Sequence, residues 1–251
     1  MKLSKHCYLI SGLAVEPPWA VNAGFIVGRH TTMIVDTGSN RLSAQTIFGY
    51  AVCAKPDNKL MVANTEPHFD HMGGNGFFLG RNIDVYAHSG VERKYEAFLQ
   101  NKEDFNNTIP NAVRRGRREA DVFFYGTELA NPNRVLSPGE TVDLGEIGVT
   151  ALSTPGHTPQ NISLFVASEG VLYCGDCVVT GYLPNLEAGG VPDWERWLAS
   201  LEVLEKLGPE TIVPGHGYTV TGHVQIGIEL DNMKTIIRKA IEDKSAPTQK
   251  P

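Results

Sequence analysis

Positions 66 to 71 of this chain of 251 residues hold a cluster of residues of the kinds that bind metal ions in proteins. Four of its six side chains can bind a cation, and the segment reads Glu66, Pro67, His68, Phe69, Asp70, His71. Alternating side chains at the end of a strand point to one side, so Glu66 and His68 can share one metal ion. Asp70 and His71 can then reach a second ion. The apolar run from Leu60 to Ala63 supplies the strand, and the pattern indicates a metal centre rather than a polar surface turn.

Three further segments have the same form, an apolar run that ends in a glycine and a ligand. They are Thr154–Pro155–Gly156–His157, Tyr173–Cys174–Gly175–Asp176 and Val213–Pro214–Gly215–His216. A glycine at such a strand end lets two backbone segments approach closely. With the first cluster, these segments supply seven candidate ligands.

In these residues the chain resembles the metallo-β-lactamase superfamily. The family pattern HxHxDH, then PGH, then GD, then PGH is matched in order and spacing over nearly the whole chain, with Glu66 in place of the first His. The resemblance implies an α/β fold of four layers, the αββα sandwich, in which two sheets pack face to face with helices outside.

The resemblance also implies a ligand set, carried over position by position. The first metal would be held by Glu66, His68 and His157, the second by Asp70, His71 and His216, and Asp176 would bridge them. A further strand-end residue, Asp36, matches a family aspartate that lies behind the metals, although a turn through Thr37 and Gly38 would also explain it.

The expected cofactors are two divalent metal ions. The carboxylate of Glu66 makes the site a weaker Lewis acid than a histidine would, and hard oxygen ligands bias it toward iron or manganese. Zinc remains the favoured ion because the general affinity order places it above both.

The function expected from this site is metal-dependent hydrolysis of an ester, thioester, lactone or amide of a small molecule. Two adjacent cations can hold a hydroxide at neutral pH as the nucleophile, and Asp70 could accept or deliver the proton. Two alternatives stay open: a dioxygenase with a single iron, and a β-lactamase-like activity. The bridging Asp176 resembles glyoxalase II and lactonase branches more than true β-lactamases.

Candidate substrate contacts lie outside the ligand motifs. Trp19, in the connection between the first two strands, could line the pocket, and Tyr182 could polarise a substrate carbonyl through its hydroxyl. Packing roles explain both residues equally well. An arginine run at 114–118 within a segment that resembles a lid (96–124) could recognise an anionic group or could form a solvated helix face. Cys174 and Cys177 flank Asp176, and we interpret them as buried inert thiols rather than a redox pair.

Length and composition favour one domain over residues 1–251, with a disordered tail at 245–251. The net charge of −6 argues against a nucleic-acid partner. No run of about 18 apolar residues occurs, and no secretion signal is evident, so we expect no membrane span and a cytoplasmic location. Exposed apolar positions on the last helix would suit a homodimer.

Apolar periodicity predicts helices over 42–54, 91–105 and 224–241. A further helix carries Trp194, Trp197 and Leu201 at helical spacing, with Asp193 as its expected N-cap and Gly208 at its end.

Overall fold

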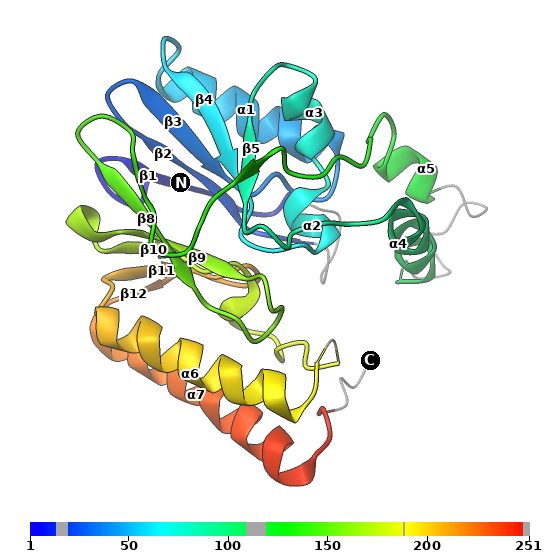
Figure 1. The fold of residues 1–251 in the computed structure, drawn as a ribbon, viewed down its shortest axis with the longest axis vertical. Helices are drawn as coiled ribbons and strands as arrows, with labels where there is room; N and C mark the ends of the chain where they lie inside the picture. The colour runs from blue at the N-terminus through cyan, green and yellow to red at the C-terminus, as the bar shows by residue number, and fades with distance from the viewer. Residues whose placement is uncertain (14–19, 109–118, 188, 248–251) are drawn as a thin grey trace.

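The computed structural model describes residues 1–13, 20–108, 119–187 and 189–247. The strands in these ranges form two six-stranded sheets, one from each half of the chain (Figure 1). The first sheet has the order β1-β2-β3-β4-β5-β6: β1 (Cys7–Ile10), β2 (Ala23–Val27), β3 (Thr31–Val35), β4 (Lys59–Ala63), β5 (Val85–Ala87) and β6 (Arg134–Val135). The second has the order β12-β11-β10-β9-β8-β7: β7 (Thr141–Asp143), β8 (Gly148–Ser153), β9 (Ile162–Val166), β10 (Val171–Tyr173), β11 (Thr211–Val213) and β12 (Val220–Thr221).

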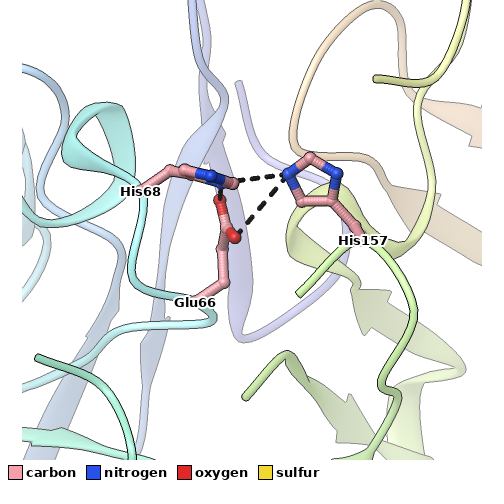
Figure 2. A group of neighbouring side chains, drawn as sticks. All are labelled: Glu66, His68 and His157. Atoms are coloured by element: carbon pink, nitrogen blue, oxygen red, sulfur yellow. Dashed lines mark hydrogen bonds and ion pairs between the residues drawn. The ribbon is translucent and has the colours of Figure 1, made fainter. Parts of the chain in front are cut away.

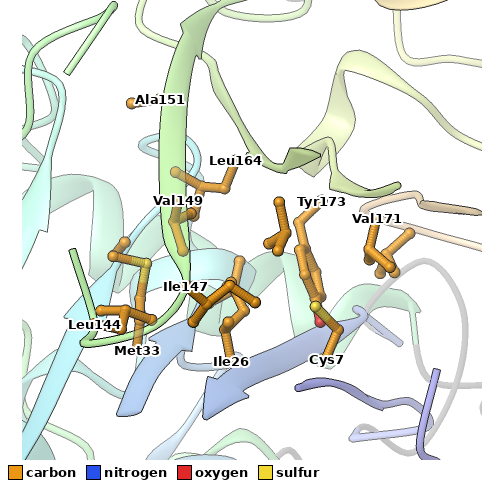
Figure 3. Close-up of a cluster of buried hydrophobic side chains, with 14 of the residues drawn as sticks. Cys7, Ile26, Met33, Leu144, Ile147, Val149, Ala151, Leu164, Val171 and Tyr173 are labelled. Carbon is orange, nitrogen blue, oxygen red and sulfur yellow. The ribbon is translucent and has the colours of Figure 1, made fainter. Parts of the chain in front are cut away.

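The main core lies between the two sheets (Figure 3). Alternate residues of each strand face it, because successive side chains of a strand point to opposite faces. Met33 and Val35 of β3 point inward, whereas Ile34 between them packs under the helices outside. In β10, Tyr173 points inward and Leu172 outward.

Helices cover both outer faces. α1 (Arg41–Ala54) and α3 (Asn75–Leu79) lie on the first sheet, where Ala44, Ile47 and Ala51 of α1 share a buried cluster with strand residues. α6 (Val191–Leu207) and α7 (His223–Asp243) lie along the second sheet (Figure 1). The predicted four-layer αββα sandwich is therefore confirmed.

The ends of α6 differ in one detail from the expectation. Gly190 is the N-cap, and Asp193 is the third helical residue, whose carboxylate accepts a hydrogen bond of 3.0 Å from the Gly190 N–H. Asp193 therefore caps the same helix end from inside the first turn, in the manner of a capping box. Gly208 ends the helix with a φ of 61°, as predicted.

Two helices of the inserted segment project beside the first sheet (Figure 1). They are α4 (Tyr95–Thr108) and α5 (Glu119–Phe123), and the arginine run lies outside the described residues. Phe98 of α4 stacks on Phe69 at 4.7 Å between ring centroids, and Phe124 contacts Phe69 edge-on at 5.7 Å. Phe69 belongs to the short helix α2 (Phe69–Met72), so the insertion rests directly on the ligand motif.

Strand direction brings the ligand motifs to one edge of the sandwich. β3 pairs with β4 in parallel, and β10 pairs with β11 in parallel, so each pair ends at the same edge. β8 runs in the same direction as β10, because β9 between them is antiparallel to both. The loops that follow these strands carry every predicted ligand.

The carboxyl end of the described chain is packed rather than free up to Ala246. Ser245 donates its N–H to Ala240 O at 3.1 Å, and Ala246 packs against the cluster under α6 and α7. The remainder of the expected tail, from 248 to 251, lies outside the described residues. Across the ranges that the structure covers, no helix combines the length and apolar character needed to cross a bilayer.

Candidate metal centre

The first ligand motif follows β4 and enters α2. His68 has extended backbone angles, φ −67° and ψ 150°, and directly precedes the helix, whereas Asp70 and His71 lie within it. Because the chain changes direction after His68, the side chains before and after the turn approach the same site from two sides. Pro67 lies directly before this turn, as expected for proline, which is common in turns and at helix starts.

The first donor group consists of Glu66, His68 and His157 (Figure 2). Glu66 Oε1 lies 2.9 Å from His68 Nδ1, and His68 Nδ1 lies 3.0 Å from His157 Nε2. Glu66 Oε2 lies 3.8 Å from the same His157 nitrogen. The three donors thus face one another from two loops, although His68 and His157 are 89 positions apart in the chain. His68 presents Nδ1 where His157 presents Nε2.

The second donor group consists of Asp70, His71 and His216. Asp70 Oδ2 lies 3.0 Å from His216 Nε2 and 3.9 Å from His71 Nε2. His71 has no exposed side-chain surface, and Asp70 and His216 retain 17% and 13%. Asp70 and His216 are therefore open to solvent on this side of the site, and His68, with 29% of its side chain exposed, is open on the other.

Asp176 lies between the two groups. Its Oδ1 is 3.2 Å from His71 Nε2, and its Oδ2 is 3.4 Å from both His157 Nε2 and His216 Nε2. The structure thus brings together all seven residues that the sequence singled out, in the two groups that the resemblance implies.

The outward nitrogens of three histidines are held by the protein. His71 Nδ1 lies 2.9 Å from Asp36 Oδ2, His157 Nδ1 lies 3.3 Å from Asn185 O, and His216 Nδ1 lies 3.1 Å from Ala20 O. Each acceptor favours the tautomer with the proton on Nδ1, which leaves Nε2 as the free electron-pair donor. Asp36 therefore occupies the place behind the ligands that was predicted for it.

A buried polar network fixes the backbone of the first motif. The carbonyl of His71 accepts the Thr37 N–H at 2.8 Å and the Asn64 side-chain amide at 3.1 Å. Asn75 donates to Asn64 Oδ1 at 2.8 Å, which orients that amide. All of these residues have 0% exposed surface, and their hydrogen bonds hold the His71 backbone in place.

Glycines in two motifs are required by close contacts. A Cβ at Gly215 would lie 1.9 Å from Asp176 Oδ1, and a Cβ at Gly156 would lie 2.3 Å from the Cβ of Trp197. Gly156 also has a φ of 153°, which other residues rarely adopt. These glycines let the two histidine loops pack against Asp176 and α6.

Opposite charges set the ionisation of the site. Burial alone would raise the pKa of Glu66 and Asp176, but the neighbouring histidines outweigh it and hold both pKa values below the usual range. Burial alone would lower the pKa of His71 and His216, but the surrounding carboxylates raise both well above the usual value. Glu66 and Asp176 are therefore negatively charged at neutral pH, and their charges would attract a cation bound between them.

The donor atoms fit a cation. Within the described ranges, Glu66 Oε2, His71 Nε2 and Asp176 Oδ1 are buried without a hydrogen-bond partner. Leaving such atoms unpaired is costly, and a cation would satisfy them all. The donor atoms form three sets, and within each set the atoms lie within 4.8 Å of one another. Oxygen and imidazole donors of this kind suit zinc, iron or manganese.

The remaining predicted residues are less closely tied to the centre. Trp19 and the arginine run lie outside the described residues. Tyr182, on the loop after Asp176, is 49% exposed, and among described residues it makes no hydrogen bond or ring contact with the seven ligand candidates. Cys174 and Cys177 are fully buried and free of disulfides, in agreement with the expected burial.

Three residues support the ligand loops through contacts that were not predicted from the sequence. Arg93 donates to Pro67 O at 3.1 Å and to Asn101 Oδ1 of α4 at 3.0 Å. Asn22 donates from its amide to Pro214 O at 2.9 Å, and Trp197 donates to Cys177 O at 2.8 Å while its ring lies 5.4 Å from that of His157. Each acts on a ligand loop from a distant part of the chain, and no local sequence signal marks such contacts.

Comparison with known proteins agrees with this geometry. The family model of the metallo-β-lactamase superfamily matches residues 17–216. The chain belongs to this superfamily, as the resemblance predicted, and relatives of the chain are named as hydrolases.

Named relatives are hydrolases of several kinds. The probable metallo-hydrolase YflN of Bacillus subtilis is 28% identical over 63% of this chain and 64% of its own length. The acyl-coenzyme A thioesterase MBLAC2 of Gallus gallus is 26% identical over 78% of this chain and 72% of its own length. A hydroxyacylglutathione hydrolase of Acidiphilium cryptum is 32% identical over 44% of each chain. The chain therefore spans less than two thirds of the first and third of these relatives.

The fold has a solved counterpart in a metallo-β-lactamase family protein from Thermus thermophilus. The TM-score is 0.70 at 21% identity, and the match covers 95% of this chain and 81% of that one. At this identity the likeness concerns the fold alone.

Proposed function

We propose that this protein is a binuclear metal-dependent hydrolase that cleaves a thioester or a related ester, lactone or amide of a small molecule. The observation that carries the proposal is the convergence of two complete donor groups, each with two histidines and one carboxylate, on opposite sides of Asp176. A single structural ion would need only one of these groups.

Two divalent cations at these donors would supply a water activated at neutral pH and an electrophile for the carbonyl oxygen of the substrate. Glu66, His68 and His157 would hold one cation, and Asp70, His71 and His216 the other, with Asp176 shared. Zinc is the favoured ion, with iron or manganese as alternatives.

Asp70 is the residue we assign to proton transfer. Burial alone would raise its pKa, but His71 and His216 beside it hold the pKa well below the usual range, so the carboxylate is charged at neutral pH. Its Oδ2 faces His216, and its 17% exposure leaves it reachable by a substrate and its water. The low pKa makes this carboxylate a weak base, so the assignment rests on its reach: from this place it can accept the proton of the attacking water and return it to the leaving group.

A thioester is the preferred substrate class within the proposal. One relative is an acyl-coenzyme A thioesterase and another hydrolyses hydroxyacylglutathione, whose scissile bond is likewise a thioester. Tyr182 remains a candidate for contact with the acyl carbonyl, because this half-exposed residue lies on the loop that follows Asp176. Trp19 stays a predicted pocket residue.

One observation favours the alternative of a dioxygenase with a single iron. Replacement of the first family histidine by Glu66 turns the first donor group into two histidines and one carboxylate, the ligand set typical of non-haem iron oxygenases. That chemistry would leave Asp70, His71 and His216 without a metal, and the binuclear hydrolase uses them all.

Metal analysis combined with a substrate panel tests the proposal. The protein is expressed with balanced zinc, iron and manganese, its metal content is measured by mass spectrometry, and hydrolysis is assayed on acyl-coenzyme A, acyl-glutathione, lactone and β-lactam substrates. Two metals per chain and thioester turnover that is lost in His157→Ala would support it. His88→Ala, a histidine outside both donor groups, is the matched control. One iron per chain and oxygen consumption without hydrolysis would establish the alternative.

A homodimer and a cytoplasmic location stay predictions. Val224 and Ile228 on α7 are 81% and 48% exposed, which agrees with the apolar surface expected on the last helix. Size-exclusion chromatography with light scattering tests the dimer.

A further inference from the structure

Glu66 contributes to two of the donor groups rather than one. It joins His68 and His157 in the first, and it joins His71 and Asp176 in a third group whose ligand atoms also lie within 4.8 Å of one another. His71 likewise occurs in two groups, but a histidine has one nitrogen facing the centre and can bind only one cation there. A carboxylate has two oxygens and can bind two.

The distances place the Glu66 carboxylate between the two sides of the site. Its Oε1 lies 2.9 Å from His68 Nδ1, on the first side, and 3.3 Å from His71 Nε2, on the second. Its Oε2 is fully buried without a hydrogen-bond partner, 3.8 Å from His157 Nε2. The side chain has 0% exposed surface, so no solvent competes for the unpaired oxygen.

Asp176 has the same relationship to the histidines from the opposite loop. One of its oxygens lies 3.2 Å from His71 Nε2, and the other lies 3.4 Å from His157 Nε2. Both carboxylates therefore reach from His157 to His71. A histidine at position 66 would offer one nitrogen and could not span this interval.

We propose that Glu66 is a second bridging ligand, with one carboxylate oxygen for each cation, so that Glu66 and Asp176 together clamp the metal pair. This inference rests on the proposed binuclear site. Two bridging carboxylates make the donor set harder than one with a third histidine on the first metal, which shifts relative affinity toward manganese and iron.

The number and strength of the metal-binding steps show whether Glu66 binds both cations or only one. Metal-free wild-type protein, Glu66→Gln, Glu66→Asp and His68→Ala are each titrated with Zn²⁺ against a chromophoric chelator, after circular dichroism has established that each variant is folded. His68→Ala is the matched control, because His68 occurs only in the first donor group. Glu66→Asp keeps the charge and both oxygens but is one methylene shorter, which draws the carboxylate back from the histidines of both sides.

The bridge predicts two binding steps for wild type and the loss of one step in His68→Ala. In Glu66→Gln the affinity of both binding steps falls by at least about tenfold. A loss of this size is the smaller end of the range typical when even a group that supports a metal ligand is removed. In Glu66→Asp both steps also stay weaker than in wild type, because the shorter side chain withdraws an oxygen from each side.

Four results would overturn the inference. Weakening of only one step in Glu66→Gln would make Glu66 a ligand of one cation, and the binuclear hydrolase would stand. Two binding steps of wild-type strength in Glu66→Asp would mean that only the charge of Glu66 matters. Weakening of both steps in His68→Ala would mean that any substitution at the site disturbs both cations. Fewer than two steps in the wild-type protein would remove the proposed function itself, and the bridge with it.

Discussion

Asp36 Oδ2 lies 2.9 Å from His71 Nδ1, and this contact ties the end of β3 to the buried ligand of α2. The other oxygen, Oδ1, accepts the backbone N–H of Thr65 at 2.8 Å, at the end of β4. Asp36 adopts a φ of 60°, a left-handed conformation that is uncommon outside glycine. A residue held in that conformation while its carboxylate joins two loops is fixed by its surroundings, and its position fixes His71 in turn.

Asp36→Ala should therefore weaken metal binding without removing a ligand. The loss of the acceptor frees the His71 ring and its tautomer, for which about 10- to 100-fold in metal affinity is typical. It also leaves the Thr65 N–H buried without a partner, at a cost of about 1–3 kcal/mol in the free energy of unfolding. Chelator competition and denaturant unfolding measure the two effects, and unchanged affinity would show that Asp36 serves only the turn.

Gly215→Ala should disrupt the centre from outside the ligand set. Its new Cβ would lie 1.9 Å from Asp176 Oδ1, and also 2.8 Å from the backbone carbon of Gly175, so the carboxylate and its loop must move. We expect loss of at least one bound metal, measured as metal content per chain, and a lower melting temperature.

Gly227→Ala is the matched control for this substitution. Gly227 lies in α7, and nothing lies within 4 Å of the added Cβ. Because alanine is the better helix former, this variant should gain about 0.5–1 kcal/mol in stability and keep its metals. Equal behaviour of the two alanine variants would contradict the role assigned to the contact between Gly215 and Asp176.

The candidate ligands could be predicted from the sequence because all of them lie after the end of a strand, four after β4 and one each after β8, β10 and β11. Glu66 comes three residues after β4, and Asp176 comes three after β10, so the direction of the strands carries both to one edge. The rule that parallel strands end together needs no knowledge of distant contacts.

The supporting residues could not be predicted in this way. Asn22 reaches Pro214 O across 192 positions of the chain, and Arg93 reaches Pro67 O only because the fold turns between them. The strands β6 and β12 have two residues each, too few for alternation to show. Asp193 was assigned the wrong position in the first turn of α6, since Ser, Thr and Asp patterns do not separate an N-cap from a capping-box acid.

The four thiols should differ sharply in reactivity. Burial raises the pKa of Cys177 to about 12 and that of Cys7 to about 11, and raises the pKa of Cys174 well above its usual value. Thiolate is the reactive form, so these three remain protonated and shielded at pH 8, whereas Cys53 is exposed. A disulfide reagent should titrate one thiol in native protein and four after denaturation. Rapid reaction of a second and third native thiol would instead support a redox role for the pair around Asp176.

Metal binding should release protons and strengthen as the pH rises. In the metal-free protein, burial acts to lower the pKa of His71 and His216, but the nearby carboxylates raise both pKa values well above 6.5, so both rings are protonated on both nitrogens at neutral pH. A cation binds only the deprotonated nitrogen, and each proton displaced makes the affinity rise about tenfold per pH unit below the pKa of that ring.

Titration calorimetry in two buffers of different ionisation enthalpy counts the protons released by Zn²⁺. At pH 7 we expect more than one proton per metal pair, and His88→Ala should release the same number because that ring lies outside the donor groups. Binding that is independent of both buffer and pH would mean that neither His71 nor His216 exchanges a proton for the metal. Both rings would then be neutral in the metal-free protein, which would contradict the raised pKa values assigned to them.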